Sequence, residues 1–277
     1  MDKNGNENLV KTLSLDELTP GDNAIGLNNG LRGYWGFNGD TKNHSKLGKR
    51  LDARQINGAE LKSAKAPRNG VLKLNRATSQ YLSVPRSMLD DNADTYTAAS
   101  WIKSSTLPVH DSQDRQFIME SYINNHCDLP QALETGLAIS IGLRASDNPE
   151  KINLQLYTET LVPQTVGSQR SPGKKIQGGF DCLLDRGQFS DWTQVVVTFD
   201  SKTLRLYIDG KPIKSHPLPI SAPIAETGGL IIGGHRGGGG RNFDGMIDDV
   251  AVWNRVLTKN EIAKLFKVGI PTNIPTD

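Results

Sequence analysis

The sequence has no apolar run that could cross a membrane. Its longest apolar stretches, such as VVV at 195–197 and LII at 230–232, are far shorter than the roughly 20 residues that a transmembrane helix needs. Residues 1–20 also lack a basic segment followed by an apolar one, so no secretory signal peptide is predicted. Met1 is either a native start or the start of a chain from which an upstream segment was removed, and both interpretations stay open.

An excess of charge of one sign is missing as well. The chain has 32 Lys and Arg against 30 Asp and Glu, a formal net charge of +2, and it contains no block of five like charges. Nucleic-acid-binding proteins carry basic patches, so a nucleic-acid partner is not predicted. Apolar residues make up 36% of the chain and charged residues 22%, which is enough apolar surface for a folded core.

Cysteine is scarce, which limits covalent and metal-based stabilisation. The two cysteines, Cys127 and Cys182, are too few for a disulfide-rich scaffold and lack the spacing of a zinc site. A single disulfide between them and two separate thiols are alternatives that the sequence leaves open.

The length of 277 residues fits one large domain, because all-β sandwiches reach about 200–250 residues as single units. Residues 1–30 are polar and contain a Pro-Gly turn signal, which indicates a leader or linker. The domain is expected at 31–268 and is followed by a tail at 269–277. Residues 158–190 are polar and rich in Gly, Pro and Gln, and are interpreted as a surface excursion that interrupts the strands.

Short alternating runs bounded by Gly, Asn, Asp and Pro predict an all-β fold, as a sandwich or barrel. The clearest runs are 195–199 and 204–208, in which every second residue is apolar. The Asp-Gly pair at 209–210 then gives a two-residue hairpin turn, because glycine tolerates positive φ. An earlier hairpin is expected from 137–143 and 152–156.

One helix is predicted near the C-terminus, at 258–266. Thr258 can cap its first turn and Glu261 can hydrogen-bond back from three residues further on, which together form a capping box. The apolar residues of this segment are expected to dock the helix onto the β-fold.

Four segments carry a resemblance to a known family. They are GYWGFNGD (33–40), YLSVPRSMLDDNADTYTAASWIKS (81–104), DWTQVVVTFDSKTLRLYIDGKPI (191–213) and FDGMIDDVAVWNRVLTKNEIAKLF (243–266). In this order and spacing the chain resembles the bacterial laminin-G-like, concanavalin A-like lectin/glucanase domains. The chain departs from the family after Trp192, where the family often has histidine and this chain has Thr193 and Gln194.

The resemblance implies a fold and a function. The fold is a two-sheet antiparallel β-sandwich of the jelly-roll type with a short C-terminal helix. The function is non-catalytic, lectin-like binding of a carbohydrate or glycan, as a module of a bacterial envelope or secreted protein that is extracellular, on the cell surface or periplasmic. The alternative is a structural or protein-interaction module of a larger surface protein, with a protein as its partner.

A glycoside hydrolase is the third interpretation. Such enzymes need two carboxylates about 5 to 9.5 Å apart, which on a strand requires acidic residues at even spacing. Glu120, Glu134 and Glu159 each lack such a neighbour. No catalytic residue is therefore predicted, and the chain is expected not to be an enzyme.

Aromatic residues are few, at 6% of the chain. All four tryptophans fall within the strand motifs and are expected in the core, where each ring buries a large apolar area. They are Trp35, Trp101, Trp192 and Trp253. Tyr122 and Phe180 lie outside the clear strands and are the candidates for exposed rings on which a sugar could stack.

A glycine-rich loop, GGHRGGGGRNFDG at 233–245, joins two predicted strands. It lacks the pattern and the following helix of a phosphate-binding loop, so it is interpreted as a flexible loop. Its polar residues His235, Arg236 and Arg241 are predicted to contact a ligand, since mobile loops commonly carry recognition residues.

The pair Asp248 and Asp249 lies in a predicted strand, where adjacent side chains point to opposite faces. One carboxylate should therefore be buried, and a buried carboxylate needs a partner. The resemblance implies a structural Ca²⁺ where the first and last strands meet, with Asp248 as a ligand together with Asn38 and Asp40. A hydrogen-bonding or turn role without metal is the alternative.

Overall fold

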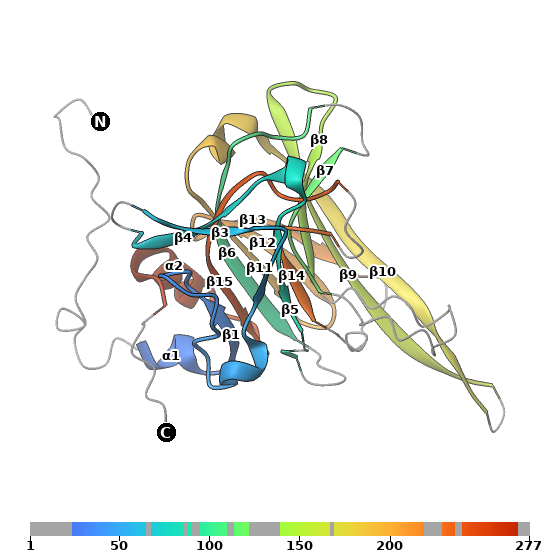
Figure 1. Cartoon of the computed structure of the whole chain (residues 1–277). Helices are drawn as coiled ribbons and strands as arrows, with labels where there is room; N and C mark the ends of the chain where they lie inside the picture. Colours follow the sequence, from blue (N-terminus) through green and yellow to red (C-terminus); the bar gives the residue numbers. More distant parts are fainter. Residues whose placement is uncertain are drawn as a thin grey trace.

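The fold is a sandwich of two antiparallel sheets (Figure 1). The computed structural model describes residues 24–64, 68–85, 88–89, 95–109, 114–121, 139–166, 169–218, 229–235 and 240–270, without the side chains of 24–25, 159–166 and 169–177. Among them, no helix is long and apolar enough to cross a membrane. The predicted two-sheet antiparallel sandwich is confirmed.

The first sheet, sheet A, has eight strands. Its order is β13 (Lys211–Pro217), β12 (Thr203–Ile208), β11 (Thr193–Phe199), β6 (Tyr96–Ser104), β15 (Gly245–Trp253), β4 (Gly70–Leu74) and β3 (Glu60–Ser63), with β1 (Leu31–Trp35) also paired to β15. The first and last strands of the chain thus lie next to each other.

The second sheet, sheet B, has seven strands. Its order is β10 (Gln169–Asp185), β9 (Lys151–Val166), β8 (Ser140–Ala145), β7 (Arg115–Ser121), β14 (Leu230–Ile232), β5 (Tyr81–Val84) and β2 (Arg54–Ile56). The helical segments are α1 (Ala24–Asn28), α2 (Lys259–Val268) and the short 3-10 helices η2 (Gly48–Leu51), η3 (Arg76–Thr78) and η5 (Arg186–Ser190).

The main core fills the space between the sheets. Alternate residues of β11 point into it, and so do alternate residues of its neighbour β6. They are Val195, Val197 and Phe199 from β11, and Tyr96, Ala98 and Ile102 from β6. The predicted alternation is therefore confirmed. The predicted hairpin is also confirmed, because β12 and β13 are joined by Asp209 and Gly210, both with positive φ.

A second core lies on the other face of sheet A, where α1 and α2 cover it (Figure 1). Ala99 and Val196, which point away from the main core, pack there with apolar residues of both helices. Trp253 donates a hydrogen bond from Nε1 to the carbonyl oxygen of Leu27 in α1 at 2.6 Å. Part of the segment predicted as a leader or linker therefore belongs to the folded body.

Strands β9 and β10 form a long two-stranded ribbon that extends past the sandwich (Figure 1). Their pairing continues to Val166 and Gln169, whereas β8 pairs with β9 only from Ile152 to Tyr157. The interpretation of 158–190 as an excursion that interrupts the strands is wrong for most of its length. The sequence pattern missed it because a ribbon with no sheet beneath it needs no apolar alternation.

Helix α2 confirms the predicted helix and its capping box. Thr258 Oγ1 accepts a hydrogen bond from the backbone nitrogen of Glu261 at 3.2 Å, and Glu261 Oε2 accepts one from the backbone nitrogen of Thr258 at 2.8 Å. Ile262 and Leu265 are buried in the second core. The helix is thus fixed at its start by the cap and along one side by packing.

Replacing Thr258 with alanine is expected to lower the free energy of unfolding by about 1 kcal/mol, because a backbone N–H of the first turn loses its acceptor. Urea denaturation followed by tryptophan fluorescence measures the change. Thr258→Ser keeps the oxygen and is the matched control. An equal loss of stability in both variants would contradict the capping role.

Candidate functional site

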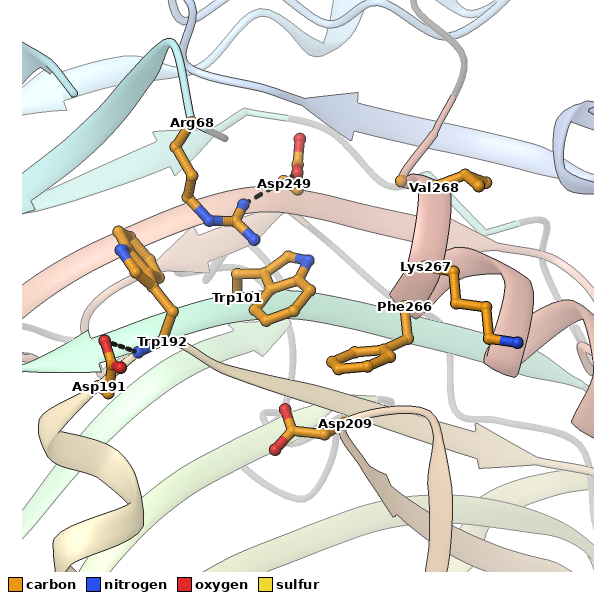
Figure 2. A pocket seen from close by; sticks show the side chains of 10 residues that line it. Arg68, Trp101, Asp191, Trp192, Asp209, Asp249, Phe266, Lys267 and Val268 are labelled. Carbon is orange, nitrogen blue, oxygen red and sulfur yellow. Dashed lines mark hydrogen bonds and ion pairs between the residues drawn. The ribbon is translucent and has the colours of Figure 1, made fainter. Parts of the chain in front are cut away.

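A pocket of about 450 Å³ opens beside the C-terminal end of α2, on the helix-covered face of sheet A (Figure 2). Aromatic rings and carboxylates predominate in its lining. The lining residues are Arg68, Trp101, Asp191, Trp192, Asp209, Asp249, Phe266, Lys267, Val268 and Gly269. They come from six separate parts of the chain, so the pocket exists only in the folded protein.

Local structure explains how these residues meet. Trp101 lies on β6, Trp192 directly precedes β11, and Phe266 lies in the last turn of α2. The β12–β13 turn approaches this helix at Gly210, where a Cβ atom would lie 2.9 Å from Phe266 Cβ. Glycine at this position therefore serves both the positive φ of the turn and the close approach that brings Asp209 to the pocket.

The tryptophans divide into two pairs. Trp35 and Trp253 are fully buried, as predicted. Trp101 and Trp192 are partly exposed and line the pocket, so the prediction that all four rings belong to the core is wrong for these two. Trp101 alternates with the inward-facing residues of β6, which places its side chain on the face of sheet A that carries the helices.

Arg68 lies among the aromatic rings. Its guanidinium carbon is 4.2 Å from the ring centroid of Trp101 and 4.8 Å from that of Trp192, distances typical of cation–π contacts. Phe266 stacks on Trp101 with 5.4 Å between ring centroids, on the side away from Arg68 in Figure 2. In space these side chains follow one another in the order Trp192, Arg68, Trp101 and Phe266, and we call them the aromatic row.

Asp248 and Asp249 both bind Arg68. Arg68 Nη1 donates to Asp248 Oδ2 at 2.6 Å and to Asp249 Oδ2 at 3.1 Å. A register shift between Asp248 and Ala251, with a φ of 48° at Asp249, interrupts the alternation of β15. Asp248 is buried, as expected for one of the two. The expectation that they point to opposite faces is wrong, because the bulge turns both carboxylates toward one guanidinium.

The two carboxylates share one cation, and this affects their titration. Burial, with a further contribution from the charge of Asp249, raises the pKa of Asp248 to about 7, while Arg68 acts in the opposite direction. Tyr34 donates its hydroxyl to Asp249 Oδ1 at 2.7 Å. Burial and the charge of Asp249 raise the pKa of this phenol, so it remains a donor at neutral pH.

Two further carboxylates stand at the outer part of the pocket. Asp209 Oδ1 accepts a hydrogen bond from the backbone nitrogen of Gln194 at 2.8 Å, and burial raises the pKa of this carboxyl. Asp191 accepts from the backbone nitrogen of Trp192 at 2.8 Å and pairs with Lys103 at 3.2 Å. These two contacts lower the pKa of Asp191. The lowered pKa keeps Asp191 ionised at neutral pH, and the carboxyl oxygens of both groups can accept further hydrogen bonds.

The residues predicted to bind calcium do not meet in one ligand set. Asp248 is held by Arg68, and a second cation beside that guanidinium would be repelled. Asp40 instead accepts hydrogen bonds from the ring of His44 and the backbone nitrogen of Lys42, both at 3.0 Å, and Asn38 is exposed. Within the described residues, no group of three acidic, His or Cys side chains is arranged to hold a metal. Calcium binding stays a prediction, which melting curves with and without EDTA would test.

The predicted ligand contacts lie away from this pocket. Phe180 is buried in the main core and contacts His216, with 5.7 Å between ring centroids, so it is not an exposed platform. His235 stacks on Phe117 of β7 at 4.8 Å, and its Nδ1 lies 2.8 Å from Glu120 Oε2.

The backbone carbonyl oxygen of Arg241 accepts a hydrogen bond from the backbone nitrogen of Phe117 at 3.0 Å. Arg241 therefore lies beside β7 of sheet B. Neither Arg241 nor His235 lines the pocket. Tyr122, Arg236 and Cys127 lie outside the described residues. Cys182 is buried, and a disulfide with Cys127 and two separate thiols both stay open.

Several pocket residues were not predicted from the sequence. The alternation of β6 carries a signal for Trp101, because Tyr96, Ala98 and Ile102 occupy the other face of that strand. Arg68 has no comparable signal. It lies 180 positions from Asp248 along the chain, and only the arrangement of β4 beside β15 brings the two together.

Residues 76–263 match the family model described as the concanavalin A-like lectin/glucanases superfamily. That match covers more than half of the chain. The chain belongs to this superfamily. The resemblance seen in the four sequence segments is thereby confirmed for this concanavalin A-like domain, although no curated protein matches it in sequence.

Solved structures share the fold of this concanavalin A-like domain. The binding domain of Paraclostridial Mosquitocidal Protein 1 has 16% identity and a TM-score of 0.56, over 87% of this chain and 52% of that chain. Domain 4 of AbnA, a GH43 extracellular arabinanase from Geobacillus stearothermophilus solved with arabinotriose, has 15% identity and a TM-score of 0.50, over 85% and 97%.

The binding domain of Botulinum neurotoxin DC is a third similar structure. Solved in complex with SialylT, it has 14% identity and a TM-score of 0.55, over 86% of this chain and 51% of that chain. Solved with rat synaptotagmin II, it has 14% identity and a TM-score of 0.56, over 87% and 52%. This chain thus spans about half the length of the toxin domains, and identities this low show the fold alone.

The raised pKa of Asp248 predicts a pH-dependent stability. Between pH values near 4 and 7, the Asp248 carboxyl is protonated in the folded protein and ionised in the unfolded chain. The free energy of unfolding should therefore fall as pH rises through this range and level off above about pH 7. The upper limit for one proton is about 1.4 kcal/mol per pH unit. Asp248→Asn should remove this contribution.

Urea denaturation of both proteins at several pH values measures the difference. The free energy of unfolding of Asp248→Asn relative to the parent chain should increase with pH. Asp147, exposed on the turn before β9, offers the control Asp147→Asn, whose difference from the parent chain should stay constant. A constant difference for Asp248→Asn as well would show that the carboxyl does not take up a proton on folding.

Proposed function

We propose that this concanavalin A-like domain is a non-catalytic carbohydrate-binding module and that the pocket beside α2 is its binding site. The observation that supports this most directly is the composition of the pocket wall. Partly exposed Trp and Phe rings stand beside carboxylates. A sugar ring presents C–H groups that pack on an aromatic surface and hydroxyl groups that donate to carboxylate oxygens, so such a wall matches both sides of a pyranose.

The aromatic row decides which rings a sugar can meet. Trp101 is flanked by Arg68 and Phe266, so a ligand would reach mainly its edge. Trp192 and Phe266 stand at the two ends of the row (Figure 2) and each has a side that the row does not cover. Asp191 and Asp209 lie near them and supply hydrogen-bond acceptors. A short stretch of one or two sugar units fits a pocket of about 450 Å³.

Relatives in fold support a binding role without specifying the ligand. The AbnA domain was solved with arabinotriose, and this chain covers nearly all of that domain. The neurotoxin DC domain was solved once with SialylT and once with rat synaptotagmin II. A protein partner is therefore the second candidate. We place the module outside the cell, on its surface or in the periplasm, where extended glycans are found.

Removing the Trp192 ring should weaken binding. Titration calorimetry against arabinotriose, cello-oligosaccharides and chito-oligosaccharides identifies the ligand class. For any of these that binds, Trp192→Ala is expected to lower the affinity by about tenfold or more, since stacking contacts of this type contribute about 1–2 kcal/mol. Trp192→Phe keeps an aromatic face and should retain most of the affinity.

The control removes exposed apolar surface elsewhere. Leu183 is 54% exposed on β10, in the other sheet, and Leu183→Ala should bind like the parent chain. Binding that is insensitive to Trp192 would contradict this assignment of the site. Absence of glycan binding together with capture of a purified protein receptor would favour the interaction module, and release of reducing sugars from a polysaccharide would favour a hydrolase.

A further inference from the structure

We infer that the pocket prefers a sugar that carries a free, protonated amine, such as a hexosamine without its N-acetyl group. This inference rests on the proposed function and adds the charge class of the ligand. The pocket and its aromatic row provide the binding surface. The charges around that surface then distinguish between amine-bearing, neutral and acidic sugars.

Carboxyl groups and basic groups both surround the pocket. Four acidic side chains and three basic ones lie in its lining or contact the lining directly. The acidic ones are Asp191, Asp209, Asp248 and Asp249, and the basic ones are Arg68, Lys103 and Lys267. Asp248, with a pKa raised to about 7, is largely protonated at mildly acidic pH, so the outer carboxyl groups of Asp191 and Asp209 decide the preference. A carboxylated sugar would lie beside these two groups, whereas an ammonium group would donate hydrogen bonds to them.

The inner end of the pocket already binds a cation of the chain itself. The guanidinium of Arg68 is 9% exposed and contacts two indole rings and two carboxylates. The same wall continues outward with Trp192, Asp191 and Asp209. A ligand ammonium placed there would meet the same kinds of group that hold Arg68, an aromatic face and an acceptor oxygen.

Asp209 is the carboxylate best placed to receive that ammonium. It is half-buried and accepts hydrogen bonds from the backbone nitrogen of Gln194 and from the Gln188 side chain, and the positive charge of Lys211 acts on it from further away. Within the described part of the chain it forms no ion pair. Asp191 by contrast pairs with Lys103, and Asp249 pairs with Arg68. An incoming ammonium group would therefore give Asp209 a direct ion pair, in addition to the more distant charge of Lys211.

Lys267 is the basic group that could oppose this preference. It is exposed and its ammonium points away from Arg68 and Trp101 in Figure 2. Water screens a charge in that position more effectively than it screens the half-buried Asp209. The inner surface of the pocket therefore keeps its acidic character.

Three tetramers test the inference by titration calorimetry at mildly acidic pH and low salt. They are the tetramers of glucosamine, N-acetylglucosamine and galacturonic acid, which carry positive, no and negative charge. The glucosamine tetramer should bind about tenfold more tightly than the N-acetylated one, as for a hydrogen bond to a charged group. The galacturonate tetramer should bind most weakly, and added salt should reduce the difference.

Asp209→Asn isolates the charge that carries the preference. Asparagine keeps the oxygen that accepts from Gln194 and tolerates the positive φ of 50° at this turn. The variant should lose the preference for the glucosamine tetramer and leave the affinity for the N-acetylated tetramer unchanged. Asp147→Asn removes an exposed carboxylate outside the pocket and should preserve the preference. Should Asp209→Asn melt early, Asp209→Gly replaces it, because glycine also tolerates the positive φ at this turn.

Each outcome bears on one of the two proposals. The charge preference is overturned if the glucosamine tetramer binds no more tightly than the N-acetylglucosamine tetramer. If Trp192→Ala still lowers the affinity in that case, the proposed carbohydrate site is supported. A preference that falls equally in Asp147→Asn and Asp209→Asn shows general attraction to the surface and also overturns it. Absence of any binding that depends on Trp192 overturns both.

Discussion

The pocket depends on the guanidinium group of Arg68. This one group lies against two indole rings and binds two carboxylates, and almost none of it reaches solvent. Removing the carboxylates would leave a buried cation without counter-charge, and removing the arginine would leave the buried Asp248 and the partly exposed Asp249 side by side without a cation. The aromatic and acidic parts of the wall are therefore one unit, and they hold each other in place.

This unit forms where sheet A is buried on both faces. One face packs against sheet B, and the other carries α1 and α2 over a second core. That second core fixes α2, and the position of α2 sets Phe266 beside Trp101. A bulge in β15 then turns Asp249 toward the same place as Asp248. The pocket is thus a consequence of how the helix closes the outer face of the sheet.

The proposed binding role draws on the chemistry of the pocket wall, and the fold is one that binding domains share. The superfamily match places the chain among concanavalin A-like domains, and several structures that share the fold are binding domains. The wall combines ring faces with acceptor oxygens, a combination suited to a ligand with both C–H and hydroxyl groups. The loop residues His235 and Arg241 contact β7 and do not line this pocket, and ligand binding by them stays a prediction.

The sequence alone determined the features that arise from local periodicity. Alternation gave the strands that line the main core, the Asp-Gly pair gave the β12–β13 turn, and Thr258 with Glu261 gave the helix start. These features depend on neighbours within a few positions, which a pattern can register.

Only the tertiary structure decided the site. Arg68 and Asp248 are 180 positions apart in the sequence. The bulge that redirects Asp249 cannot be recognised from the sequence pattern of β15. An apolar alternation shows that Trp101 and Trp192 lie in strand motifs. It does not show how much of each face of the sheet is covered by other parts of the chain. The exposure of these two rings depends on the positions of α2 and Arg68, which follow from packing between distant segments.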